Sequence, residues 1–126
     1  MVLFSYNKLG DNMALRGIVI DPGHGGSDPG AVSNGIKEKD YDLLISKYMY
    51  DRFKSLGVPV SITRTSDVTL SPKERVNKIK GFYGDSKDVI VISNHLNAGG
   101  GDGAEIIYAL RNNSTLPSKI ASDIEK

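Results

Sequence analysis

The stretch that decides the fold is Gly17-Ile18-Val19-Ile20-Asp21-Pro22-Gly23-His24. Its continuous apolar, β-branched run is typical of a strand buried in a parallel sheet. A second such run, Val89-Ile90-Val91-Ile92-Ser93-Asn94, leads directly to His95, and these two histidines are the only ones in the chain. Side chains just past the ends of parallel strands project into the crevice where α/β proteins place their chemistry. Because imidazole is the commonest metal ligand among side chains, the pattern predicts that the two histidines are two ligands of one metal site.

The remaining periodicity predicts strands that alternate with helices. An apolar stripe with a 3.6-residue period begins at Glu38 and ends at Gly57, and a capping-box pattern opens a second helix at Ser71 that ends near Gly81–Gly84. The expected strands are Arg16–Asp21, Val58–Arg64, Asp88–Ser93 and Ala104–Leu110. This order is typical of an α/β domain, a three-layer α/β/α arrangement with a mostly parallel sheet.

Composition excludes several classes of partner and site. The net charge is +1 and the basic residues are scattered, which argues against nucleic acid as a partner. Cysteine is absent, so any metal must be held by histidine and carboxylates. No stretch reaches the roughly 18 apolar residues of a membrane span, and the N-terminus has no signal-peptide pattern. Residues 1–13 show neither periodicity nor caps and are expected to be a disordered extension or an upstream start.

Glu38 is the best candidate for a third metal ligand. It lies 14 residues after His24, across a glycine-rich loop that can fold back and return the helix start to the strand end. Asp40 and Asp42 compete with it but lie on other parts of the first helical turn. Two histidines and a glutamate can hold a metal ion that acts as a Lewis acid in the hydrolysis of an amide.

Four motifs in the right order resemble those of the zinc-dependent N-acetylmuramoyl-L-alanine amidases of bacterial cell walls. They are Ile18–Ala31, Gly35–Asp40, Thr63–Asp67 together with Leu70–Arg75, and Ser93–Ala98. The resemblance implies a zinc-exopeptidase-like (phosphorylase/hydrolase-like) architecture, with His24, Glu38 and His95 as ligands of one Zn²⁺ ion. It also implies hydrolysis of the amide between N-acetylmuramic acid and L-alanine in peptidoglycan, at the cell wall, by a protein released on lysis or exported by a route not visible in the chain.

The resemblance further implies a general-base glutamate late in the domain, which is expected beyond Lys126. Residues 14–126 are then the N-terminal two-thirds of one amidase-like domain, with low activity of their own and with self-association through an incomplete sheet. Glu105 is a weak substitute for the base, and Asn97 is a candidate for the substrate groove. Two alternatives stay open. They are a catalytically impaired remnant that binds zinc and muropeptide, and a zinc carboxypeptidase-like enzyme.

Overall fold

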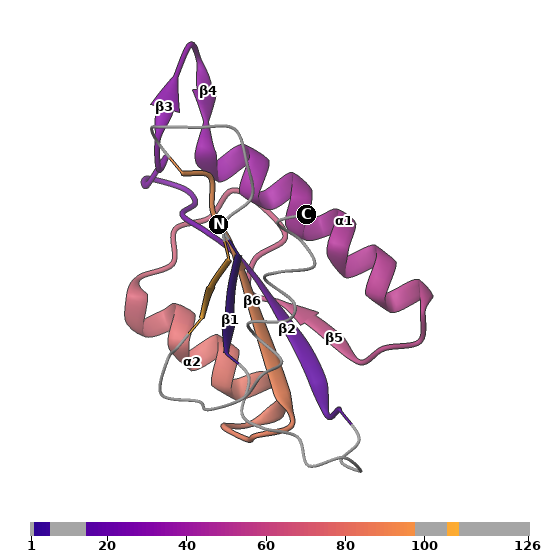
Figure 1. Ribbon diagram of the computed structural model, residues 1–126. Helices are drawn as coiled ribbons and strands as arrows, with labels where there is room; N and C mark the ends of the chain where they lie inside the picture. Colours follow the sequence, from indigo (N-terminus) through magenta and orange to yellow (C-terminus); the bar gives the residue numbers. More distant parts are fainter. Residues whose placement is uncertain (1, 6–14, 98–105, 109–126) are drawn as a thin grey trace.

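The computed structural model describes residues 2–5, 15–97 and 106–108, and side chains within 15–97 (Figure 1). The elements in chain order are β1 (Val2–Ser5), β2 (Gly17–Pro22), β3 (Val32–Ser33), β4 (Ile36–Lys37), α1 (Glu38–Ser55), β5 (Val60–Ile62), α2 (Pro72–Tyr83), β6 (Val89–Asn94) and β7 (Ile106–Tyr108). Strands β2, β5 and β6 and both helices form where the hydrophobic pattern predicts them. Strand β7 lies inside the expected range 104–110, whose other residues are outside the described part.

The main sheet has the strand order β5-β2-β6-β1-β7. Strand β2 pairs in parallel with β5 on one side and with β6 on the other, whereas β1 runs antiparallel to β6. In the β2–β6 register, Asp21 lies beside Ser93 and Pro22 beside Asn94. Because the two strands end level with each other, the residues that follow them emerge at the same edge of the sheet.

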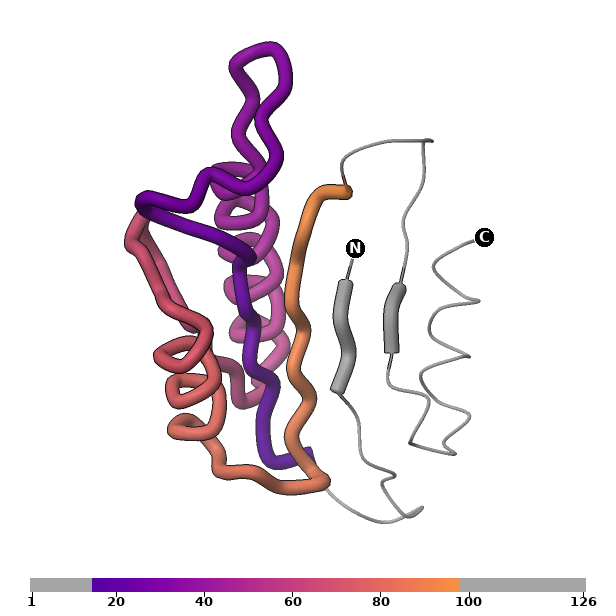
Figure 2. Tube along the Cα trace, turned by 90° about the vertical axis from the view of Figure 1, so that its left-hand side faces the viewer, coloured from indigo at the N-terminus to yellow at the C-terminus, as the bar shows by residue number. Residues whose placement is uncertain are grey.

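The two helices cover opposite faces of this sheet (Figures 1 and 2). Ile18, Ile20 and Ile92 form the buried core on one face, against Met49 and Phe53 of α1. On the other face, a Cβ built on Gly17 would meet the Tyr83 ring of α2 at 2.5 Å. Side chains that alternate along β2 thus contact α1 and α2 in turn, which confirms the predicted mostly parallel α/β fold with a helix layer on each side of the sheet.

Residues 2–5 correct the prediction that the first thirteen residues are a disordered extension. They form β1, in which Val2 pairs with Asn94 and Ser5 with Val91. The outer edge of β6 presents unpaired backbone groups, and the β-prone sequence Val2-Leu3-Phe4 can satisfy them. Residues 6–13 lie outside the described residues, as do Lys126 and the side chains that were expected to drive self-association.

A hairpin, β3–β4, interrupts the loop that the sequence analysis treated as irregular, and it rises above the body of the molecule in Figure 1. Its turn residues Asn34 and Gly35 have φ angles of 50° and 76°. Positive φ at both central residues is the mark of the type I′ turn, for which Asn-Gly is the preferred pair. That dipeptide was the signal that could have predicted the hairpin.

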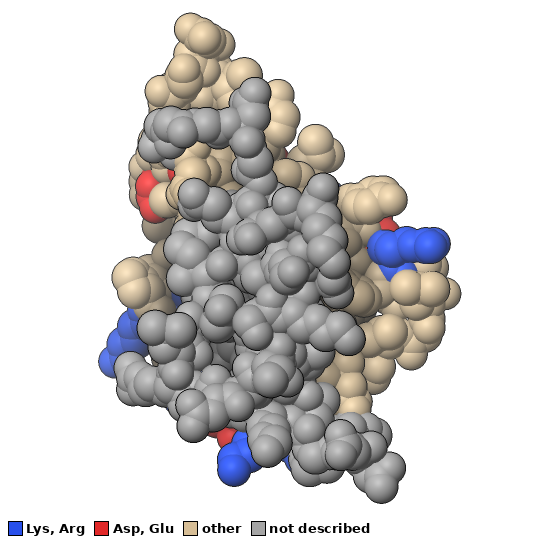
Figure 3. All heavy atoms as spheres, in the orientation of Figure 1, with Lys and Arg blue, Asp and Glu red and all other residues tan. Residues whose placement is uncertain are grey.

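On the face shown in Figure 3, the described lysine and arginine side chains lie at separate places around the rim and form no continuous patch. Neither helix in the described part of the chain is long and apolar enough to cross a membrane.

Candidate metal centre

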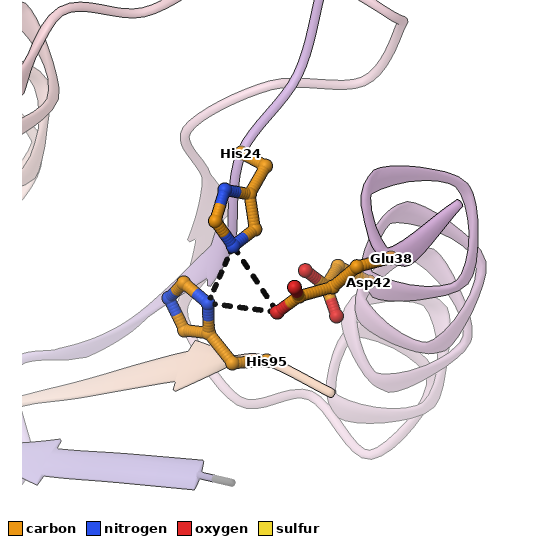
Figure 4. A group of neighbouring side chains, drawn as sticks. All are labelled: His24, Glu38, Asp42 and His95. Atoms are coloured by element: carbon orange, nitrogen blue, oxygen red, sulfur yellow. Dashed lines mark hydrogen bonds and ion pairs between the residues drawn. The ribbon is translucent and has the colours of Figure 1, made fainter. Parts of the chain in front are cut away.

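Three side chains from three elements meet at the edge of the sheet where β2 and β6 end (Figure 4). His24 Nε2 lies 3.1 Å from Glu38 Oε1 and 3.2 Å from His95 Nδ1. The third side of the triangle, from His95 Nδ1 to Glu38 Oε1, is 3.2 Å. The structure therefore brings together the three residues that the sequence analysis selected as ligands.

The donor set and its spacing fit a tetrahedral zinc ion. Ligand atoms held by zinc at about 2.0–2.1 Å stand about 3.3–3.4 Å apart in a tetrahedron. The three separations of 3.1 to 3.2 Å are close to that edge length. Two imidazole nitrogens and one carboxylate oxygen are also a donor set that zinc accepts.

Local backbone geometry brings the ligands this close. His24 has a φ of 55°, in the left-handed region, which turns the chain sharply after β2. Gly30 allows the glycine loop to pass the site, since a Cβ there would lie 2.6 Å from Glu38 Oε2 and 2.7 Å from His24 Cδ2. Glu38 then opens α1, as the sequence predicts, and points back at the histidines.

Hydrogen bonds hold His24 and Glu38 in orientation. His24 Nδ1 lies 2.8 Å from the Asp28 carboxylate, which favours the tautomer with Nε2 free to bind a metal. Glu38 accepts from the backbone N–H of Ala31 at 2.8 Å and of Leu96 at 3.0 Å, so these orienting contacts belong to two of the three ligands.

The ionisation of the ligands follows from these contacts. Burial alone would raise the pKa of Glu38, but the Ala31 N–H, His24, His95 and the Leu96 N–H hold it below its usual value. Burial alone would lower the pKa of His24, but Asp28 and Glu38 outweigh it and raise that pKa. The carboxylate is therefore already in the form that binds a cation.

Two arginines fix the loop that carries His24. Arg64 is buried and donates to the carbonyl oxygens of Gly23 at 2.6 Å and Lys39 at 2.9 Å. Arg75 donates to Asp21 at 2.7 Å and to the His24 carbonyl at 2.9 Å. Asp21 thus anchors Arg75 next to the loop.

Asp42 joins the cluster, contrary to the sequence reasoning that set it aside. One of its oxygens lies within 4.8 Å of the ligand atoms of the other three residues, and its side chain is fully buried. Burial and the neighbouring Glu38 raise the pKa of Asp42 to about 7. Positions four apart lie on the same helical face, so the spacing from Glu38 to Asp42 was the signal that could have found it.

The structure places only some of the other candidates. Asp40 is exposed on α1. Asn97 is exposed two residues beyond His95, and its place in a substrate groove stays a prediction. Glu105 lies outside the described residues, and its role as a substitute base also stays a prediction.

Comparison with known proteins decides the family. The family model described as N-acetylmuramoyl-L-alanine amidase matches residues 18–126. The chain belongs to this amidase family. The sporulation-specific amidase of Bacillus subtilis is 41% identical over 90 residues, which are 70% of this chain and 34% of the relative. Amidase LytC of the same organism is 31% identical over 122 residues, which are 94% of this chain and 24% of the relative.

Solved structures are similar to this chain. Cwp6 from Clostridium difficile superposes with a TM-score of 0.61 at 38% identity, over 71% of this chain and 14% of Cwp6. The catalytic domain of the amidase CwlV from Bacillus (Paenibacillus) polymyxa gives 0.59 at 30% identity, over 68% of this chain and 48% of that domain. The chain spans 52% of the uncharacterized protein YqiI of Bacillus subtilis, to which it is 34% identical, and a smaller share of both curated amidases.

Proposed function

We propose that His24, Glu38 and His95 hold one zinc ion and that the domain they belong to hydrolyses the amide between N-acetylmuramic acid and L-alanine in peptidoglycan. The observation that carries the proposal is the triangle of His24 Nε2, Glu38 Oε1 and His95 Nδ1, with sides of 3.1 to 3.2 Å, in a chain of the amidase family. Relatives named as cell-wall and sporulation amidases support peptidoglycan as the substrate and the cell wall as the place of action.

A bound zinc ion supplies the Lewis acid that polarises an amide carbonyl and lowers the pKa of its water. The residues of the chain orient that chemistry. Asp28 holds the imidazole of His24 with Nε2 toward the site, and the N–H groups of Ala31 and Leu96 hold the Glu38 carboxylate. These contacts fix the orientation of two of the three proposed ligands.

Access to the site suits a polymeric substrate. The His24 and His95 side chains are 24% and 27% exposed, whereas Glu38 is 6% exposed. The imidazoles thus border solvent and the carboxylate lies behind them. An amide on a surface chain can approach from the histidine side without first entering a closed cavity.

The test is digestion of purified peptidoglycan with zinc supplied. We expect the chain to release stem peptides slowly, in line with the low activity expected above, with new amino-terminal L-alanine and no new reducing sugar ends. A chelator or the His95→Ala substitution should abolish this release. Release of carboxyl-terminal amino acids instead would support the carboxypeptidase alternative and overturn the proposal. Zinc-dependent muropeptide binding without any release would favour the non-catalytic alternative.

A further inference from the structure

Asp42 carries a buried carboxylate that nothing in the described part of the chain satisfies. Its side chain is 0% exposed, and neither Oδ1 nor Oδ2 has a hydrogen-bond partner among the described residues. A buried ionised carboxylate is costly unless a cation or hydrogen-bond donors face it. At a pH above its raised pKa of about 7, the ionised Asp42 carboxylate therefore destabilises the protein unless a cation that binds the site compensates it.

Among the described residues, no neighbouring side chain pairs with Asp42 through a hydrogen bond. Arg64 attracts Asp42 from a distance, but its guanidinium hydrogens go to backbone carbonyls, among them those of Gly23 and Lys39. Glu38, one turn earlier on α1, repels it. The histidines are the only other titratable members of the cluster, and each must be neutral to bind a metal.

Charge balance points to a divalent ion. At pH 8, where the test below is made, and with both imidazoles neutral, the cluster of four residues carries one negative charge on Glu38 and one on Asp42. We infer that Asp42 supplies the second negative charge of the metal site, so that the site with a divalent cation bound is electrically neutral and Asp42 sets its affinity for the ion. This inference rests on the proposed metal site.

The geometry makes this a role at a distance rather than a fourth metal bond. Asp42 lies beside Glu38 on α1, outside the triangle of dashed lines in Figure 4. Its nearest oxygen is within 4.8 Å of the three ligand atoms, which themselves stand 3.1 to 3.2 Å apart. In a dry interior, charges at such separations interact strongly. The fourth coordination position stays available for water or substrate.

The test compares Asp42→Asn with Asp40→Asn in the full chain at pH 8. Both variants remove one carboxylate charge from the first turns of α1, but Asp40 is exposed. We expect Asp42→Asn to weaken zinc binding about 10- to 100-fold, measured by competition with a chromophoric chelator. Asp40→Asn should change it less than about threefold, because water screens an exposed charge.

A second measurement separates this role from a merely structural one. In urea unfolding of the chelator-treated protein, Asp42→Asn should have a higher midpoint than the parent, because the amide is cheaper to bury than an unpaired carboxylate. With saturating zinc the order should reverse. If Asp42 had only a structural role, Asp42→Asn would have a lower urea midpoint than the parent both without zinc and with saturating zinc.

Two outcomes would overturn the inference. One is zinc affinity of Asp42→Asn within threefold of Asp40→Asn, and the other is loss of affinity in Asp42→Glu equal to that in Asp42→Gln. The Glu and Gln pair differs only in charge and decides the question if Asp42→Asn does not fold. If the parent chain itself binds no zinc, the proposed function fails together with this inference. If the parent binds zinc and Asp42→Asn binds it equally well, only this inference is refuted.

Discussion

Gly30 shows how tightly the site is packed at the scale of single residues. A Cβ there would lie 2.6 Å from Glu38 Oε2 and 2.7 Å from His24 Cδ2, and the residue has a φ of +65°. Gly57 has a similar φ of +75° but nothing within 4 Å of its virtual Cβ. The two glycines therefore separate the cost of backbone conformation from the cost of crowding the ligands.

We expect Gly30→Ala to lose zinc affinity and Gly57→Ala to keep it. Both should lose about 1–2 kcal/mol of unfolding free energy, because alanine is disfavoured at positive φ. Only Gly30→Ala pushes Glu38 and His24 apart. Zinc titration and urea unfolding of the two variants measure this, and equal zinc affinities would show that the crowding at Gly30 is absorbed elsewhere.

The three ligands could be predicted from the sequence, because each sits at a boundary that periodicity marks. His24 and His95 follow apolar strands, and Glu38 opens α1, whose start the sequence predicts. Asp42 was not predicted as a member of the cluster, because the prediction did not use its spacing of four residues from Glu38 on the same helical face. Its burial depends on packing of α1 against the sheet, which a local pattern does not contain.

At the scale of elements, Arg64 ties the loop after β2 to the first turn of α1. One guanidinium nitrogen donates to Gly23 and Lys39, which belong to these two segments. Lysine is a point charge on a flexible stem and cannot reproduce the planar fork of arginine. The segments that carry His24 and Glu38 thus share one buried donor.

Arg64→Lys should lower the unfolding free energy by about 2–3 kcal/mol, since buried carbonyls lose charge-assisted hydrogen bonds. Arg52→Lys on the exposed side of α1 should change it by less than about 0.5 kcal/mol. Chemical denaturation monitored by circular dichroism compares the two. A loss in Arg64→Lys no larger than that in Arg52→Lys would mean that the clamp adds no stability.

The start of α2 has the capping box that the sequence predicts. Ser71 and Glu74 form the expected reciprocal capping box, with the Ser71 hydroxyl accepting from the Glu74 N–H at 3.2 Å. Ser71→Ala should therefore lower the unfolding free energy by about 1 kcal/mol. Ser55→Ala, where the hydroxyl donates to an exposed helix-end carbonyl, should cost less than about 0.5 kcal/mol. Equal thermal shifts in the two variants would argue against the cap.

Other elements could not be predicted for physical reasons. Strand β1 depends on the open edge of β6, more than 80 residues away in the sequence, and local propensity alone does not show that edge. The hairpin β3–β4 has two-residue strands, too short for a period-2 pattern to appear. Long elements with a clear period, such as α1 and β6, appeared where they were expected.

At the scale of the whole molecule, the metal site joins three segments far apart in the sequence. The loop after β2, the start of α1 and the end of β6 each contribute one ligand. An ion that binds only this folded arrangement shifts the unfolding equilibrium by mass action, by about 2.7 kcal/mol at 100 times the dissociation constant.

Zinc should therefore raise the melting temperature of the chain in a concentration-dependent way, and a chelator should reverse the rise. Magnesium should have little effect, because it prefers an all-oxygen octahedral shell to imidazole nitrogen. Differential scanning fluorimetry over a zinc series measures this in the parent and in His95→Ala. A zinc-dependent rise that survives in His95→Ala would place the ion elsewhere.

The central claim is that His24, Glu38 and His95 bind one zinc ion, and X-ray absorption spectroscopy of the zinc-loaded chain tests it most directly. The account predicts one zinc per chain, nitrogen and oxygen neighbours at about 2.0–2.1 Å, and the outer-shell scattering of two imidazoles. In His24→Ala and in His95→Ala that scattering should fall to one imidazole or the ion should be lost. The account would be contradicted if the spectrum of the parent showed fewer than two imidazoles. It would also be contradicted if the imidazole scattering in His24→Ala or His95→Ala equalled that of the parent.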